Sequence, residues 1–219
     1  MYLAIEGVIG AGKTSLARLL QPDFDSELLL EAFEENPFLS DFYADRKRYA
    51  FQTQIFFLLS RYHQQREVVP SAVSRGSLIA DYTFAKDRLF AQLNLQGDEL
   101  DTYHQVHEAL AERIPVPDLV VYLRVDTDTA MHRIALRDRP YERDMSRSYI
   151  DELNQAYERH FGRAGRQTVL IIEASHLDFV NHSTDLKLIA ERIRGALSIP
   201  PFQAQLPLVD EGLNSADAN

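Results

Sequence analysis

"GVIGAGKT", residues 7–14, is the stretch that decides the fold, since it matches the pattern G-x-x-x-x-G-K-[ST]. The apolar residues 1–7 predict a strand that ends in a turn, and "KTSLARLL", residues 13–20, has the spacing of a helix. Backbone N–H groups in a loop between a strand and a helix point inward and hold phosphate oxygens. The sequence therefore predicts a binding site for a nucleoside triphosphate.

The polar residues of this loop predict how ATP and its Mg²⁺ are held. The Lys13 ammonium should reach the β- and γ-phosphates, and the Thr14 hydroxyl should bind Mg²⁺. A second anionic group is needed at the end of another core strand, and Asp81, which closes "SLIAD", is our candidate. The alternative is that Asp81 only caps the helix that starts near Thr83. The predicted ATP-binding residues of the loop are Gly7, Val8, Ile9, Gly10, Ala11, Gly12, Lys13, Thr14 and Ser15.

Strand and helix patterns alternate along residues 1–199. Nearly continuous apolar runs at 77–81, 117–125 and 168–174 are typical of core strands of a parallel sheet. The segments 1–7 and 28–30 are two further predicted strands. This alternation predicts the three-layer α/β fold of P-loop NTPases, a five-stranded parallel sheet with helices on both faces. The predicted helices after the first are 51–69, 84–94, 98–113, 127–137, 146–161 and 184–197.

Two segments outside this regular pattern carry separate expectations. Residues 200–219 turn to Gln, Asp, Asn and Ser, so we expect one domain over 1–199 followed by a flexible tail. The helix at 51–69 is apolar on most of its faces at 55–59, so we expect wide burial there, either in the core of one chain or at the interface of a homodimer.

Composition narrows the class of protein. The 219 residues include no cysteine, which excludes disulfides and thiolate metal sites and fits the cytoplasm. The formal charge of −10 argues against a nucleic-acid polymer as partner. We expect no secretion signal and no membrane span, because no apolar run approaches the ~20 residues that a span needs. The composition therefore favours a protein that acts on small molecules.

The stretch "MHRIALRDRPYERD", residues 131–144, predicts an anion clamp. Arg133 and Arg137 are four residues apart on a predicted helix, and Arg139 follows at its end. Three guanidinium groups at one place repel each other unless a polyanion lies between them, and phosphoryl transfer needs such charge neutralisation. The helix should end before Pro140, so that the following stretch acts as a lid. The alternative is a solvated helix with arginines paired to nearby acids.

The acids in "LLLEAFEENPFL", residues 28–39, indicate what receives the phosphate. A phosphorylated acceptor needs basic residues, whereas a neutral hydroxyl is helped by a carboxylate that takes its proton. In this fold ligands bind beyond the carboxyl ends of the strands, where Glu31 should lie. Glu31 is therefore the predicted general base, while Glu34 and Glu35 are better explained as exposed acids before a helix.

Five segments, in this order, resemble the bacterial deoxynucleoside kinases over roughly residues 2–195: "GVIGAGKT", "EAFEENPFLSDFY", "FQTQIFFLLSRYHQQ", "ADYTFAKDRLFA" and "RIALRDRPYE". The resemblance implies a P-loop kinase with a flexible lid that is usually a homodimer. It makes either Glu31 or Asp81 the acceptor of the 5′-hydroxyl proton, and Arg133, Arg137 and Arg139 the lid arginines that help bind ATP. It also implies roles in substrate binding for Tyr43 and Glu142 at the sugar 3′-hydroxyl, Gln54 at the base edge, and Tyr82 and Asp87 near the base.

Several of these residues also have an explanation that involves no role in substrate binding. Gln54 could be an ordinary polar residue of its helix, Tyr43 plain core, Glu142 a surface partner of an arginine, and Asp87 a cap or a partner of Arg88. His104 and His107 are three apart but have no third ligand at metal spacing, so we expect surface residues. Phe84 and Phe90 are expected in the core.

One departure bears on the choice of base. Many members of the family have Arg and Ser after the acid, where this chain has Tyr82 and Thr83, so Lys86 or Arg88 is expected to replace the missing arginine. This pattern is closer to the bacterial deoxyguanosine kinases and favours a purine, guanine before adenine. The rival functions are a monophosphate kinase of the thymidylate kinase type, which would need arginines where this chain has glutamates, and a non-catalytic nucleotide-binding subunit.

Overall fold

A computed structural model describes residues 1–162 and 168–199. Five strands form a single sheet in the order β2-β3-β1-β4-β5, and every neighbouring pair is parallel. This confirms the predicted five-stranded parallel sheet. The tail predicted at 200–219 lies outside the described residues. The strands are β1 (Tyr2–Glu6), β2 (Ser26–Leu29), β3 (Ser77–Ala80), β4 (Leu119–Arg124) and β5 (Val169–Glu173).

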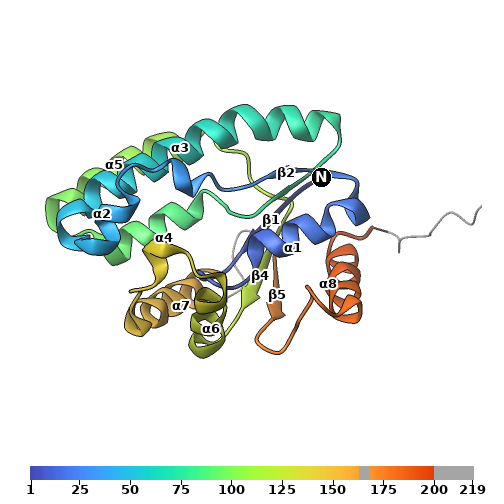
Figure 1. Ribbon diagram of the computed structural model, residues 1–219. Coiled ribbons are helices and arrows are strands. Elements are labelled where there is room, and N and C mark those ends of the chain that lie inside the picture. Colours follow the sequence, from blue (N-terminus) through green and yellow to red (C-terminus); the bar gives the residue numbers. More distant parts are fainter. Residues whose placement is uncertain (163–167, 200–219) are drawn as a thin grey trace, which may run out of the picture.

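Helices surround this sheet on both faces, with α3 running along one side of the molecule and α8 on the other (Figure 1). None of the helices in the described ranges is long and apolar enough to cross a membrane. The α-helices are α1 (Lys13–Leu20), α2 (Leu39–Ala44), α3 (Arg46–Arg75), α4 (Ala85–Asn94), α5 (Gly97–Ala111), α6 (Thr127–Arg137), α7 (Arg147–Phe161) and α8 (Ser183–Ala196).

The alternation of side chains along β1 separates the two faces of the sheet. Leu3 and Ile5 belong to the large core that includes residues of α1 and α8. Tyr2 and Ala4 point the other way, into a smaller core built with Val69 and Ala72 of α3. Because both faces of β1 are covered, its burial is complete, as the continuous apolar run predicted.

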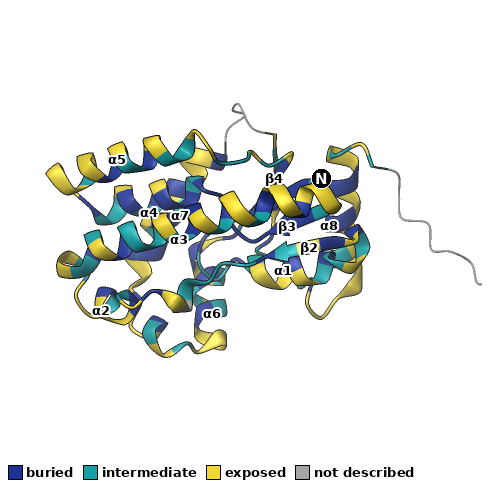
Figure 2. Ribbon diagram, turned by 90° about the horizontal axis from the view of Figure 1, so that it is seen from above, coloured by how far each residue is buried: buried dark blue, intermediate teal, exposed yellow. Residues whose placement is uncertain are grey.

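Helix α3 differs from the prediction in length and in burial. It extends over 30 residues, because the Asp45 side chain caps its first turn by accepting from the Arg48 N–H, and because it continues through the exposed Pro70. Its outer side faces solvent, as the alternating colours in Figure 2 show, and Leu59 is 40 % exposed. The expected wide burial at 55–59 is therefore wrong for a single chain.

Glu6, at the end of β1, ties three elements together from a fully buried position. Its carboxylate accepts hydrogen bonds from the Thr83 N–H (2.6 Å) and the Thr83 hydroxyl (2.8 Å), just after β3. The Tyr157 hydroxyl of α7 donates to the other oxygen at 3.2 Å. Burial raises the pKa of Glu6, and the positive charges of Lys86 and Lys13 oppose that rise. One acid thus fixes the strand ends from which the site is built.

We expect Glu6→Ala to lower the free energy of unfolding by about 3 kcal/mol, because it leaves buried donors of Thr83 and Tyr157 without partners. Urea denaturation measures the change. Glu27→Ala is the control, since Glu27 makes an exposed ion pair with Arg75 that solvent screens, and its loss should leave the stability almost unchanged. Equal effects of the two substitutions would contradict the role assigned to Glu6.

Candidate active site

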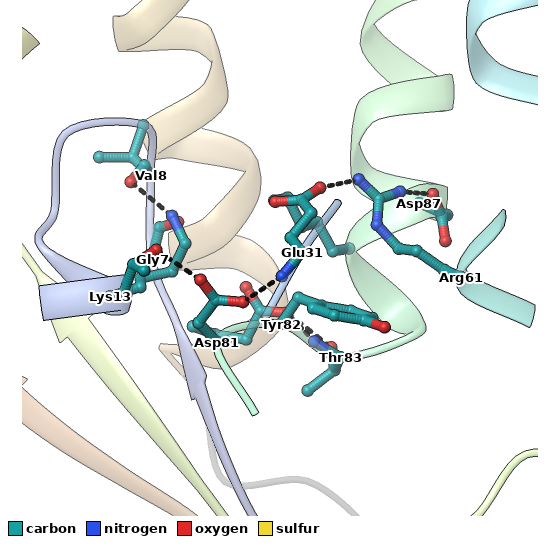
Figure 3. Close-up of polar contacts among 12 residues, drawn as sticks. Gly7, Val8, Lys13, Glu31, Arg61, Asp81, Tyr82, Thr83 and Asp87 are labelled. Atoms are coloured by element: carbon teal, nitrogen blue, oxygen red, sulfur yellow. Dashed lines mark hydrogen bonds and ion pairs between the residues drawn. The ribbon is translucent and has the colours of Figure 1, made fainter. Parts of the chain in front are cut away.

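The loop between β1 and α1 has the geometry of a phosphate cradle. Gly10 (φ +84°) and Gly12 (φ +95°) adopt left-handed backbone conformations, and a Cβ on Gly10 would lie 2.5 Å from the carbonyl oxygen of Ala130. The Lys13 ammonium donates to the carbonyl oxygens of Gly7 (2.8 Å) and Val8 (3.0 Å), so it folds back over its own loop (Figure 3). The loop therefore presents backbone N–H groups and an ammonium at the start of a helix.

Asp81 lies directly after β3 and joins this loop to the second strand. The Thr14 hydroxyl donates to one oxygen of Asp81, and the Glu31 backbone N–H donates to the other at 2.8 Å. Figure 3 shows Asp81 between Lys13 and Glu31. Mg²⁺ in phosphate sites takes one or two protein oxygens and completes its shell with phosphates and water. Thr14 and Asp81 fit that requirement, whereas no group of three or more acids or histidines suits a metal in the described ranges.

Glu31 is held between two cations. Arg61 of α3 donates to one carboxylate oxygen and Lys86 of α4 donates to the other. The side chains of Arg61 and Lys86 are only 6 % and 7 % exposed, and that of Glu31 is 13 % exposed. Burial alone raises the pKa of Glu31, but the charges of Lys86 and Arg61 outweigh it and hold the pKa well below its usual range. The carboxylate is therefore ionised at neutral pH.

The same cations act on the rest of the site. Burial, followed by repulsion from Lys86, lowers the pKa of Lys13 to about 8. Arg61 also pairs with Asp87 of α4, which is fully buried (Figure 3). Arg61 thus links two carboxylates, and its Nε has no hydrogen-bond partner in the described part of the chain.

On the far side of Glu31, residues after α6 close the site. Glu142 is buried and accepts from the Arg137 guanidinium at 2.6 and 3.2 Å, while Arg139 lies 3.6 Å from its other oxygen. The ring of Tyr43 stacks on that of Tyr141 at 6.0 Å between centroids. Glu142 is thus a buried partner of two arginines, and not a surface acid.

These groups surround one cavity of about 290 Å³. It reaches from the phosphate loop, past Asp81 and Glu31, to Gln54 on α3. Both ionised groups and aromatic rings line it, which suits a ligand that carries phosphates as well as a ring. Its lining residues are Ile9, Gly10, Gly12, Lys13, Thr14, Ser15, Glu31, Phe33, Leu39, Phe42, Tyr43, Gln54, Phe57, Arg61, Asp81, Lys86, Phe90, Arg137, Arg139, Tyr141, Glu142 and Tyr149.

The sequence of this chain is similar to those of known proteins. Residues 3–198 match the deoxynucleoside kinase family. The chain is 34 % identical to a deoxyguanosine kinase of Bacillus subtilis over 198 residues, which are 88 % of this chain and 96 % of that protein. It is 33 % identical to a deoxyadenosine kinase of Dictyostelium discoideum over 210 residues, 94 % and 82 % of the two chains.

A solved structure agrees with these relatives. The deoxyadenosine kinase of M. mycoides with bound dATP gives a TM-score of 0.77 at 28 % identity, covering 89 % of this chain and 99 % of the other. The chain belongs to the deoxynucleoside kinase family. The P-loop α/β fold and the family resemblance are therefore confirmed, and the protein is an enzyme that transfers phosphate.

In this deoxynucleoside kinase the three predicted lid arginines do not converge. Arg137 and Arg139 line the cavity, but Arg133 does not. The Arg133 guanidinium donates to the carbonyl oxygens of Ala174 and Leu177 at 3.0 Å and to that of Ala11 at 3.3 Å. The prediction of three guanidiniums around one anion is wrong for this state, because backbone carbonyls after β5 hold the first of them against the phosphate loop.

Two predicted substrate contacts also lie outside the cavity. Tyr82 is fully buried, and its hydroxyl donates to the Gln64 side chain at 2.7 Å, away from the site. Asp87 reaches the cavity only through Arg61. Both therefore act as supports for Arg61, whose guanidinium carbon lies 5.8 Å from the centre of the Tyr82 ring.

The burial of two phenylalanines, two histidines and two glutamates was also predicted from the sequence. Phe84 is buried in the core as expected, whereas Phe90 is half-buried and lines the cavity. His107 is buried, stacked on Phe84 at 4.8 Å, so its placement at the surface was wrong; His104 is half-buried. Glu35 is exposed as expected, and the side chain of Glu34 lies outside the described part.

Sequence reasoning missed Arg61 entirely. A signal was available, because Gln54, Phe57 and Arg61 are spaced three and four apart and so lie on one face of α3. The aromatic lining from Phe33, Phe57, Tyr141 and Tyr149 was also missed, because aromatic residues at such spacings usually indicate core. Of the two candidates to replace the missing arginine, Lys86 lines the cavity and donates to Glu31, whereas Arg88 is exposed.

We expect Arg61→Met to lower the free energy of unfolding by about 3–5 kcal/mol, because it leaves buried Asp87 without its ion-pair partner. Adding Asp87→Asn should restore part of the loss, since the unpaired charge is then removed. Urea denaturation measures both. Arg66→Met on the exposed side of the same helix is the control and should change stability by less than about 1 kcal/mol. A double variant that is less stable than Arg61→Met would contradict this account.

Proposed function

We propose that this deoxynucleoside kinase transfers the γ-phosphate of ATP, bound with Mg²⁺, to the 5′-hydroxyl of a purine deoxynucleoside, deoxyguanosine before deoxyadenosine, in nucleotide salvage. The observation that carries the proposal is the ionised carboxylate of Glu31 beside the phosphate loop. A carboxylate at this point repels a phosphorylated acceptor and accepts a hydrogen bond from an alcohol.

The residues around the phosphates support this reaction in the following way. The loop N–H groups and Lys13 bind the β- and γ-phosphates, and Thr14 and Asp81 hold the ion that neutralises them. Asp81 accepts from the hydroxyl of Thr14, the other proposed metal ligand, so we assign Asp81 to the metal side. Glu31 is then the acceptor for the proton of the attacking hydroxyl. Arg137 and Arg139 supply positive charge from the other wall of the cavity.

The polar groups at the end of the cavity favour guanine. Guanine presents two acceptors, O6 and N7, to which a guanidinium donates well, whereas adenine pairs best with an amide. Arg61 offers the guanidinium and Gln54 offers the amide. Both line the cavity with Phe57, so we infer that the two side chains together read a purine, with Arg61 giving the preference for guanine.

The sugar is assigned to the wall formed by Tyr43 and Glu142. Both side chains line the cavity, and a hydroxyl beside a carboxylate provides a donor and an acceptor for a 3′-hydroxyl. The negative charge of Glu142 also raises the pKa of Tyr43, after burial and Tyr149, so the phenol keeps its proton. The predicted homodimer and the predicted cytoplasmic location stay predictions.

The proposal is tested by measuring phosphate transfer from MgATP to each of the four deoxynucleosides and to thymidine monophosphate. We expect the highest kcat/KM with deoxyguanosine, then deoxyadenosine, and no transfer to the monophosphate, because Glu31 repels its charge. Highest activity on thymidine monophosphate would identify a monophosphate kinase, and no transfer to any acceptor would favour a nucleotide-binding subunit. A preference for pyrimidine deoxynucleosides would contradict the assignment of Arg61 and Gln54 to purine recognition.

Substitution Glu31→Gln tests the proton acceptor. We expect kcat to fall about 100-fold, as for a lost general base, while the affinity for ATP stays within threefold. Steady-state kinetics and titration of ATP binding provide the two measurements. Glu35→Gln is the matched control, because Glu35 is exposed and should leave kcat unchanged. A kcat for Glu31→Gln within threefold of the parent would exclude Glu31 as proton acceptor.

A further inference from the structure

Lys86 is a buried cation in the active site to which the proposed reaction gives no role. It stands in the first turn of α4, is 7 % exposed, and lines the same cavity as Lys13, Thr14 and Asp81. Its ammonium donates to Oε2 of Glu31. A lysine this far removed from water needs an anionic partner, and in the described structure it uses the carboxylate that the reaction needs.

Two lysines line this cavity, Lys13 from the phosphate loop and Lys86 from α4. Like charges in a confined cavity repel strongly unless an anion lies between them. Lys13 belongs to the phosphate loop, so an anion that approaches both lysines is the terminal phosphoryl group of the donor.

An alcohol that approaches Glu31 has to compete with the cations that already donate to both of its oxygens. Arg61 holds Oε1 and Lys86 holds Oε2. Arg61 is fixed from several sides, by the ion pair with Asp87 and by the rings of Phe57 at 4.8 Å and Tyr82 at 5.8 Å. Lys86 has a flexible four-carbon stem and three donors. Of the two cations, Lys86 is the one that can leave.

We propose that Lys86 is a catalytic residue that exchanges partners during turnover: it pairs with Glu31 before the donor binds and moves to the γ-phosphoryl group when ATP is in place, which frees Oε2 of Glu31 for the 5′-hydroxyl. This inference rests on the proposed function. The bond between the γ-phosphorus and the β–γ bridging oxygen then breaks, with its electron pair leaving on ADP. The bond from O5′ to phosphorus forms, and the 5′-proton passes to Glu31.

The exchange would couple donor binding to activation of the acceptor. While ATP is absent, Lys86 and Arg61 each pair with one oxygen of Glu31, so a cation competes with the alcohol at both oxygens. Once the phosphates draw Lys86 away, one positive charge is added at the transferred group and one is removed from the base. Both changes favour transfer to the bound alcohol.

The test compares Lys86→Met with Arg88→Met, a control on the exposed side of the same helix. The dissociation constants of ADP and of AMPPNP, a non-hydrolysable ATP analogue, are measured with Mg²⁺. We expect Lys86→Met to weaken the binding of AMPPNP about tenfold more than the binding of ADP, because a charged hydrogen bond to the γ-phosphate is lost. Arg88→Met should weaken the binding of neither nucleotide. Equal weakening of both nucleotides, or of neither, by Lys86→Met would overturn the proposal.

Kinetics provide the second readout. We expect kcat of Lys86→Met to fall about 100-fold, as for other lost contacts to a transferring group, with the KM for the deoxynucleoside changed less than threefold. Lys86→Arg should recover part of kcat, since it keeps the charge. A purely structural role would instead lower the melting temperature and raise both KM values, with no recovery by Arg, and that result would also overturn the proposal.

A measurement on the parent protein covers the case in which Lys86→Met does not fold. Acetylation of lysines, followed by mass spectrometry, reports how accessible Lys86 is. We expect AMPPNP to protect Lys86 more than ADP does, and equal protection would contradict the exchange. The nucleotide-binding and labelling results do not depend on the acceptor, so they remain valid if the parent protein phosphorylates no deoxynucleoside, an outcome that refutes the proposed function alone.

Discussion

The site depends on the compensation of buried charge at the carboxyl ends of the strands. Glu31, Asp87, Arg61 and Lys86 are all largely buried, and burial of an unpaired charge costs several kcal/mol. Each of these buried charges is therefore tolerated only because its partners of opposite charge are present. Because the partners come from the end of β2, from α3 and from α4, the charges are satisfied only when the sheet and both helices are assembled. The chemistry of the site and the correct packing of the fold are thus one requirement.

Glu6 extends this requirement to the phosphate loop. It stands immediately before Gly7 and binds Thr83, two residues after Asp81, while Tyr157 approaches from α7. A single carboxylate thus connects the start of the loop, the segment that follows Asp81, and α7. The site is consequently built on the ends of buried strands.

The distribution of charge in the cavity agrees with the proposed reaction. Lys13, Arg137 and Arg139 are cations that suit the phosphates of a donor, whereas the carboxylate of Glu31 suits an alcohol better than a second phosphate. Aromatic rings and the pair Gln54 and Arg61 then offer a flat, polar-edged surface for a base. The family shown by comparison acts on neutral deoxynucleosides, which agrees with this division.

The sequence by itself determined what depends on local chemistry. The phosphate loop, the parallel sheet and the approximate positions of most helices followed from glycine spacing and apolar periodicity, and the acids Glu31 and Asp81 followed from their place after predicted strands. The sequence did not determine which side chains contact each other in the folded protein. Arg133 and Arg137 share a helix but bind different partners, and Tyr82 points away from the cavity. Arg61 pairs with Asp87, 26 residues later in the chain, and with Glu31, 30 residues earlier. Ion pairing acts through space and follows the packing of α3 against α4, so only the tertiary structure could decide it.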